Sequence, residues 1–208
     1  MLCLITNRKL VEEENYYKTI EEAIEGGVDI VILREKDLTT KELTPIAIKI
    51  KSIIDSYNDK IADSHKRTLL IINSNKEVAE KVSADGYHIS FESFEEEGKQ
   101  YNGLLGVSVH SLEEAIYAEK NGADYVLASH IFPTKCKEGL EPKGVDFIKK
   151  IKTHLKIPVI ALGGINSENC YLLREAGANG IAVMSYIMSS SKPKEDTKII
   201  KKNLFGEL

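Results

Sequence analysis

The chain of 208 residues contains no tryptophan, only three cysteines and only five prolines. Cys3, Cys136 and Cys170 have neither the paired spacing of a metal site nor the density of a disulfide-stapled domain, which indicates a reducing compartment. No run approaches the roughly 18 consecutive apolar residues of a membrane-spanning helix. The apolar stretch 2–6 follows the first residue directly, without the lead of a signal peptide, so we expect a cytoplasmic protein with no membrane partner.

Positive charge is not in excess either. The chain has 28 basic and 32 acidic residues, a formal net charge of −4, and no basic stripe with interleaved aromatic residues. We therefore expect no nucleic-acid partner. A hydrophobic content of 42% and a charged content of 29% are ordinary for a globular protein, and the length suits one α/β domain that covers residues 1–208.

Short apolar strands alternate with longer amphipathic helices along the chain. We expect strands at Leu2–Thr6, Ile30–Arg34, Leu69–Asn73, Gly86–Ile89, Leu104–Val109, Tyr125–Ala128, Val159–Leu162 and Gly180–Val183. We expect helices at Thr19–Glu25, Thr40–Ser56, Lys76–Ser83, Leu112–Asn121, Val145–His154, Glu168–Ala176 and Pro193–Leu204. Because parallel strands require crossover helices, this order predicts a single (β/α)8 TIM barrel. The alternative is a doubly wound open sheet, which the missing Gly-rich dinucleotide turn after the first strand disfavours. The connections 57–68 and 90–102 are predicted to be exposed loops.

The fifth strand stops at a histidine. His110 is followed at once by Ser111 and, three residues later, by Glu114, the capping-box pattern of a helix start. Ligands bind at the carboxyl ends of strands in α/β sheets, and an imidazole with an ordinary pKa near ~6.5 suits proton transfer. His110 is therefore the candidate catalytic residue. The alternative is a histidine satisfied by local hydrogen bonds.

The seventh and eighth strands run into loops typical of phosphate binding. Gly163 and Gly164 follow one strand, and Met184 and Ser185 follow the other. In barrels these two loops commonly hold a phosphate through backbone N–H groups, and glycine lets the backbone approach an anion closely. Ser185 is expected to cap the next helix. The alternative is two ordinary turns; the phosphate interpretation implies a phosphorylated small-molecule ligand.

Cationic and amide side chains end the second and third strands. Arg34 offers the planar fork that suits a carboxylate or phosphate, Lys36 adds a point charge, and the Asn73 amide suits a heterocycle or a carboxylate. The alternative for Arg34 is an ion pair with Glu35 or Asp37 that only ties the strand to its loop.

The loop after the sixth strand has two interpretations as well. Its hydroxyls and lysines, Thr134 and Lys137 among them, suit a mobile flap over an anionic ligand, or the loop is merely solvated. Cys136 is interpreted as an inert thiol. The role of His130 stays open.

The order and spacing of these motifs resemble the thiamin phosphate synthase/TenI superfamily over nearly the whole chain. The motifs are Leu4–Thr6, Leu33–Asp37, Ile72–Asn73, Ala84–His88, Gly106–His110, Phe132–Thr134, Ile160–Ile165 and Ile181–Ser185. The resemblance implies a TIM barrel that acts on small molecules of thiamin biosynthesis. Barrels of this family often associate, which implies a homo-oligomer.

Two enzymes share this fold. Thiamin phosphate synthase couples a pyrimidine diphosphate to a thiazole phosphate, and the resemblance implies Mg²⁺ held by two aspartates, after the third and fourth strands. Ser74 and Ser93 stand at those positions here, and a hydroxyl is a poor substitute for a carboxylate on Mg²⁺. Ile32 replaces a glutamine and Cys136 a threonine of the synthase pattern.

The second enzyme is thiazole tautomerase, and segments 108–115, 139–141 and 180–185 look closer to it, although Lys36 resembles the synthase. On that resemblance we predict an isomerase without cofactor or metal that aromatises a 2-carboxy-4-methylthiazole ethyl phosphate precursor. His110 would move the ring proton, and Arg34 would hold the carboxylate. The backbone N–H groups of Gly164, Met184 and Ser185 would hold the phosphate. The alternatives are the Mg²⁺-dependent synthase and a non-catalytic regulatory barrel that binds a phosphorylated ligand.

Overall fold

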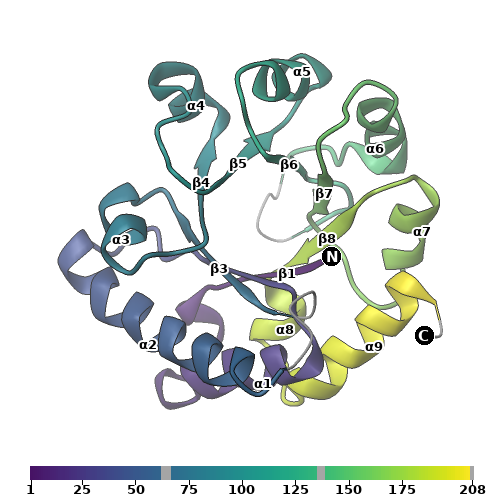
Figure 1. Ribbon diagram of the computed structural model, residues 1–208. Coiled ribbons are helices and arrows are strands. Elements are labelled where there is room, and N and C mark those ends of the chain that lie inside the picture. Colours follow the sequence, from purple (N-terminus) through teal and green to yellow (C-terminus); the bar gives the residue numbers. More distant parts are fainter. Residues whose placement is uncertain (62–66, 135–138, 207–208) are drawn as a thin grey trace.

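The computed structural model describes residues 1–61, 67–134 and 139–206, and its eight strands form a closed parallel barrel (Figure 1). Each strand pairs with the next, and β1 pairs with β8. The strands are β1 (Leu2–Ile5), β2 (Ile30–Leu33), β3 (Leu69–Asn73), β4 (Gly86–Ser90), β5 (Leu104–Val109), β6 (Tyr125–Ser129), β7 (Val159–Leu162) and β8 (Gly180–Val183). The predicted TIM-barrel fold is confirmed, and β3, β5, β7 and β8 have the predicted bounds.

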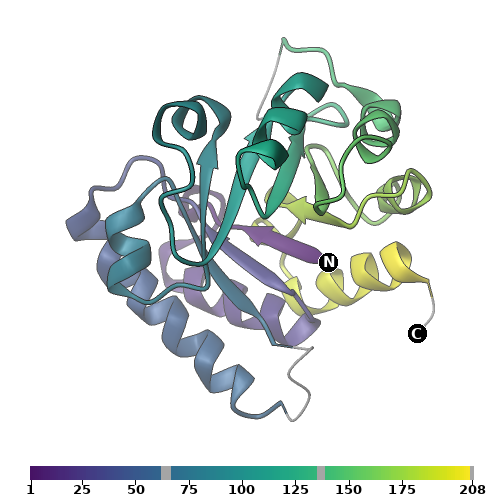
Figure 2. The same cartoon turned by 45° about the horizontal axis from the view of Figure 1, so that its top comes forward.

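Helices surround the ring of strands in Figure 1. They are α1 (Tyr16–Gly26), α2 (Thr40–Asn58), α3 (Lys76–Lys81), α4 (Phe91–Glu97), α5 (Leu112–Lys120), α6 (Gly144–Lys152), α7 (Cys170–Glu175), α8 (Ser185–Met188) and α9 (Pro193–Phe205), with 3-10 turns η1 (Arg8–Leu10) and η2 (Glu13–Asn15) in the β1–α1 connection. The last helix, α9, packs against both α1 and α7 (Figure 2). No helix among the described residues is long and apolar enough to cross a membrane.

Side chains alternate between the two faces of each strand. One face packs against the helices in a large outer core. The other face fills the barrel with a mostly apolar cluster: Cys3, Ile5, Ile30, Ile32, Ile71, Tyr125, Leu127, Ile160 and Ala182. The same alternation, continued toward the carboxyl ends of the strands, gives polar interior positions at Arg34, Asn73, Ser90, Ser108, His110 and Ser129. The barrel interior is therefore apolar over most of its length and polar at the carboxyl ends of the strands. We call this polar end the mouth.

The prediction of an exposed loop over residues 90–102 is wrong, because this connection contains α4. Ser90 caps the helix by accepting a hydrogen bond from the Ser93 N–H at 3.2 Å. Phe94 is 1% exposed and belongs to the outer core. A helix of two turns, with one buried side chain among glutamates, is too short for its periodicity to stand out in the sequence.

Replacing Phe94 should reveal how much this short helix contributes. We expect Phe94→Ala to lower the free energy of unfolding by about 3–5 kcal/mol, because it leaves a cavity in a packed core. Phe205→Ala is the matched control, since Phe205 is 40% exposed. Urea unfolding of both variants measures the difference, and equal losses would contradict the core role of Phe94.

Candidate active site

The mouth collects most of the predicted site residues, and His110 lies directly after β5. Its Nδ1 is 3.0 Å from the carbonyl oxygen of Ser129 and 3.3 Å from the Ser129 hydroxyl. A carbonyl only accepts, so Nδ1 carries the hydrogen and Nε2 is left as an acceptor. The half-buried imidazole of His110 is thus held against the end of β6 by its Nδ1 side, with Nε2 available as an acceptor.

The start of α5 is built largely as predicted. The Ser111 hydroxyl accepts the N–H of Glu114 at 3.0 Å. The Glu114 carboxylate accepts the N–H of His110 at 2.6 Å, one residue before the position that a capping box would use. These contacts fix the backbone of His110 and account for the sequence pattern around it.

A buried carboxylate ties the ends of β1 and β2 together. The Glu35 side chain is 1% exposed and accepts hydrogen bonds from the Thr6 hydroxyl at 2.9 Å and the Tyr16 phenol at 2.8 Å. The backbone and guanidinium of Arg8 donate to it as well. Burial, and then the negative charge of Glu35, raise the pKa of Tyr16. A buried charge with this many donors is well compensated.

This cluster bears on the two interpretations of Arg34. Both acidic neighbours are engaged by Arg8, which also forms a bidentate pair with Asp37 at 2.7 Å for each bond. That pairing lowers the pKa of Asp37. Arg34 continues the interior face of β2, and its positive charge contributes to lowering the pKa of His88, so its guanidinium acts on the barrel interior. The carboxylates of Glu35 and Asp37 both bind the Arg8 guanidinium. Lys36 is exposed beside it.

An amide and hydroxyls end β3 and cap α4, and the carboxylate of Glu92 in the first turn of α4 is exposed. Asn73 donates from Nδ2 to the Ser74 hydroxyl at 2.5 Å, and Ser74 has a left-handed backbone with φ 55°. Ser93 lies in the first turn of α4. Among the described residues, no group of three or more His, Cys, Asp or Glu side chains is arranged to hold a metal ion.

The glycine pair after β7 has a structural reason of its own. Both glycines have a left-handed backbone, with φ 109° at Gly163 and 66° at Gly164. A Cβ on Gly163 would collide with His130, and one on Gly164 would collide with the carbonyl of Pro133. The loop after β6 also pairs with this segment, since the Phe132 N–H donates to the Gly163 carbonyl at 3.0 Å. The pair therefore lets two mouth loops approach each other, whether or not it also meets a phosphate.

The remaining predicted residues lie on or beside these loops. Met184 and Ser185 follow β8, but Ser185 is the first residue of α8 and not its cap, because Met184 occupies the cap position. Thr134 is half-buried in the loop after β6. Lys137 and Cys136 lie outside the described residues. His130 is 5% exposed, and its Nε2 has no hydrogen-bond partner within the described part of the chain.

One polar network was not predicted. His88 lies inside the barrel, 3% exposed, with Nδ1 3.0 Å from the Tyr125 hydroxyl and Nε2 2.8 Å from the Ser108 hydroxyl. Burial, and then the charge of Arg34, lower the pKa of His88 to about 4. One feature of the sequence could have indicated this network: His88 falls at an inward-facing position of a mostly apolar strand.

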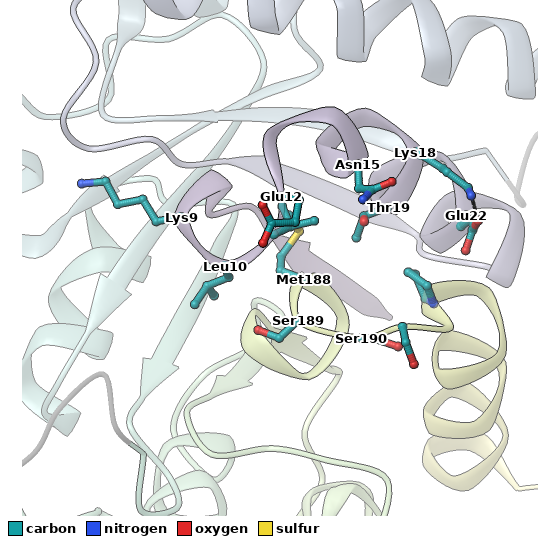
Figure 3. Close-up of a pocket in the computed structure, with 13 residues that line it drawn as sticks. Lys9, Leu10, Glu12, Asn15, Lys18, Thr19, Glu22, Met188, Ser189 and Ser190 are labelled. Carbon is teal, nitrogen blue, oxygen red and sulfur yellow. Dashed lines mark ion pairs between the residues drawn. The ribbon is translucent and has the colours of Figure 1, made fainter.

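A separate hollow lies at the side of the barrel and is shown in Figure 3. It has a volume of about 630 Å³ and is bounded by the β1–α1 connection, by α1 and by the segment between α8 and α9. Lys18 and Glu22 form an ion pair on its wall at 3.8 Å. None of the predicted site residues lines it, so the mouth remains the candidate site.

The sequence matches the family described as thiamine monophosphate synthase over residues 2–187. The chain belongs to this family. The thiamine-phosphate synthase of Clostridium acetobutylicum is 40% identical, over 97% of this chain and 95% of that protein. That of Pyrococcus abyssi is 36% identical, over 97% and 93%. A solved thiamine phosphate pyrophosphorylase from Pyrococcus furiosus is 33% identical, covers 98% of this chain with 94% of its own, and has a TM-score of 0.82.

Membership of the thiamine monophosphate synthase family confirms the predicted superfamily and overturns the predicted reaction. The relatives above are synthases, so the prediction of a thiazole tautomerase, and with it of an isomerase, is wrong. Much of segment 108–115 serves the fold, because Ser111 and Glu114 shape the strand end and the helix start. Such a segment does not identify the reaction. The proton shift assigned to His110 is withdrawn with the tautomerase.

The buried His88 should make stability depend on pH. Its pKa of about 4 in the folded protein lies below the ordinary 6.5, so the unfolded chain binds the extra proton first. The free energy of unfolding is therefore unaffected by His88 above pH 6.5. It falls by up to about 3 kcal/mol as the pH is lowered to 4, because the unfolded chain takes up a proton on His88 first. We expect His88→Gln to be less stable at neutral pH but to lose this slope, as measured by denaturant unfolding from pH 4 to 8. The exposed His154→Gln is the control and should keep it; an unchanged slope in His88→Gln would contradict the assignment.

Proposed function

We propose that the protein is a transferase of the thiamine-phosphate synthase type, which was the alternative to the tautomerase. The reaction joins a pyrimidine diphosphate to a thiazole phosphate. The bond between the pyrimidine methylene carbon and the diphosphate oxygen breaks, and a bond from that carbon to the thiazole nitrogen forms. The products are thiamin phosphate and diphosphate. Family membership with synthases at 36% and 40% identity supports this reaction class.

The observation that carries the proposal is the cationic character of the β2 end. Negative charge accumulates on the diphosphate as its bond to carbon breaks, and fixed cations stabilise such charge best in a site poor in water. Arg34 acts on the barrel interior while Arg8 engages the neighbouring carboxylates. We assign Arg34 and Lys36 to the diphosphate, with Asn73, Thr134 and Lys137 as further substrate contacts.

The thiazole phosphate is assigned to the part of the mouth at the ends of β7 and β8, with only β1 between β8 and β2. Gly163, Gly164, Met184 and Ser185 follow the adjacent strands β7 and β8, the common phosphate position of barrels. His110 offers the lone pair of Nε2 to a donor group of a bound substrate. A cytoplasmic location and a homo-oligomeric assembly belong to the same proposal.

The magnesium ion implied by the family resemblance does not fit the donor set of this mouth. Ser74 and Ser93 present neutral hydroxyls, and the neighbouring group at the end of β3 is an amide. Mg²⁺ in proteins favours carboxylate and phosphate oxygens and loses its bound waters reluctantly. We therefore assign the charge compensation of the diphosphate to the protein's own cations and derive no step through a metal held by these residues.

Supplying both substrates to the purified protein tests the reaction. We expect thiamin phosphate and diphosphate in equal amounts, identified by mass spectrometry. Arg34→Ala should lower kcat/KM by about 100-fold, because it removes a cation from the leaving group. Arg67→Ala is the matched control, since Arg67 is exposed just before the amino end of β3. Tight binding of either substrate without product would instead favour the non-catalytic regulatory barrel.

Introducing carboxylates at positions 74 and 93 tests whether the two serines are the reason that this mouth does not suit Mg²⁺. The left-handed backbone at Ser74 tolerates aspartate, and the first turn of α4 favours an acidic residue at Ser93. We expect coupling by the wild type not to depend on added Mg²⁺, and coupling by the Ser74→Asp, Ser93→Asp double variant to rise about tenfold with Mg²⁺, because Mg²⁺ favours carboxylate ligands. The double alanine variant should match wild type. Equal dependence on Mg²⁺ in the wild type and the aspartate variant would contradict the role of the two serines.

A further inference from the structure

Two cations and two carboxylates alternate directly after β2. The sequence there is Arg34-Glu35-Lys36-Asp37, so the positive and negative side-chain charges of the segment cancel. Alternation along an extended chain sends the first and third side chains to one face and the second and fourth to the other. Because the segment is neutral as a whole, it attracts an anion only if its carboxylates are compensated from elsewhere.

Arg8 compensates both carboxylates on the outer face of the barrel. Its guanidinium donates two bonds of 2.7 Å to Asp37 and one of 3.2 Å to Glu35. A guanidinium can bind two carboxylates in this way because its N–H donors form a planar fork. Lys9 adds a second cation to Asp37 at 2.9 Å. The hydrogen bonds from Arg8, and then that from Lys9, lower the pKa of Asp37, so this carboxylate stays charged.

A second set of contacts fixes the backbone of Arg34. Its N–H donates to the Thr6 hydroxyl at 3.0 Å, and that hydroxyl donates to the Glu35 carboxylate at 2.9 Å. The Tyr16 phenol donates to the same carboxylate oxygen at 2.8 Å. The Glu35 side chain is 1% exposed, so turning it toward the mouth would break these bonds in a site closed to water.

The charges of the segment are thus divided between the two faces of the barrel wall. The carboxylates and Arg8 lie outside. Burial, and then the charge of Arg34, lower the pKa of the interior His88, which places the influence of that cation inside. Lys36 shares the alternation of Arg34 and is exposed. Without Arg8, Asp37 would lose its bidentate partner and stand as a less compensated anion next to Lys36 in the chain.

We propose that Arg8 is a positioning residue for an anion that binds at the end of β2. By holding Glu35 and Asp37 on the outer face, it leaves Arg34 and Lys36 to attract a multiply charged anion at the mouth. The identity of that anion, the diphosphate of a substrate, rests on the proposed function. The division of the charges between the two faces does not.

Calorimetry with inorganic diphosphate, without added metal, tests the positioning. We expect Arg8→Ala to weaken diphosphate binding about tenfold at low ionic strength, where the repulsion from a released carboxylate is little screened. Adding Asp37→Asn to Arg8→Ala should restore most of the affinity, because it removes the released charge. Lys194→Ala is the matched control and should bind as the wild type does, since it removes one cation from an exposed ion pair with Glu25 between α9 and α1.

Salt separates an effect of charge from a loss of structure. The ratio of the wild-type and Arg8→Ala affinities should fall toward one at about 0.5 M salt, where charges are screened within a few ångströms. A purely structural lesion would persist in salt and would not be rescued by Asp37→Asn. Either of these results would overturn the proposal, as would a wild type that does not bind diphosphate.

Arg8→Lys serves if Arg8→Ala does not fold, because it keeps a cation near Glu35. Lysine lacks the planar fork, so we expect a smaller loss of diphosphate affinity, again rescued by Asp37→Asn. Wild-type affinity in a folded Arg8→Ala, or in Arg8→Lys where only that variant folds, would contradict the role of Arg8. If the binding results hold and the two substrates are not coupled, only the proposed function is wrong.

Discussion

Closure of the barrel is the constraint on which the rest of the structure depends. Because β1 pairs with β8, no strand has a free edge, and each strand must send alternate side chains inward. Register then decides which residues meet. His88 and Tyr125 lie at one level only because both are aligned with Gly106. The interior changes from apolar to polar along the strands, so the same alternation that fills the core also delivers Arg34 and Ser108 to the mouth.

Two networks of buried polar side chains are tolerated in this frame because their members are partners of one another. Glu35, outside the barrel wall, accepts hydrogen bonds from Thr6, Tyr16 and Arg8. His88, inside it, bonds Tyr125 and Ser108. The two networks do different work: the first joins β1 to β2 and engages the acidic neighbours of Arg34, and the second connects the core to the mouth. Charge at the mouth therefore depends on contacts made on the far side of the sheet.

The fold was predictable from the sequence because strands and helices recur with clear periods and short connections. Phe94 shows where that reasoning stops, since one buried side chain in a two-turn helix leaves no period to detect. The mouth residues Arg34, Asn73 and His110 were predictable from their positions at strand ends. The pairing of Arg8 with Asp37 and the His88 network were not, because each joins residues at least 20 positions apart through side-chain geometry.

The reaction was harder to predict than the site, and the reason is physical. The residues around His110 resemble the tautomerase partly because they end a strand and cap a helix, which are tasks of the fold. Residues that are needed to form the fold therefore say little about which reaction the protein catalyses. Ser74 and Ser93 carry more, because replacing a hydroxyl by a carboxylate changes the charge of the mouth without disturbing the backbone. Differences between members of this family should therefore be sought first in charged positions at the strand ends, where the fold imposes little.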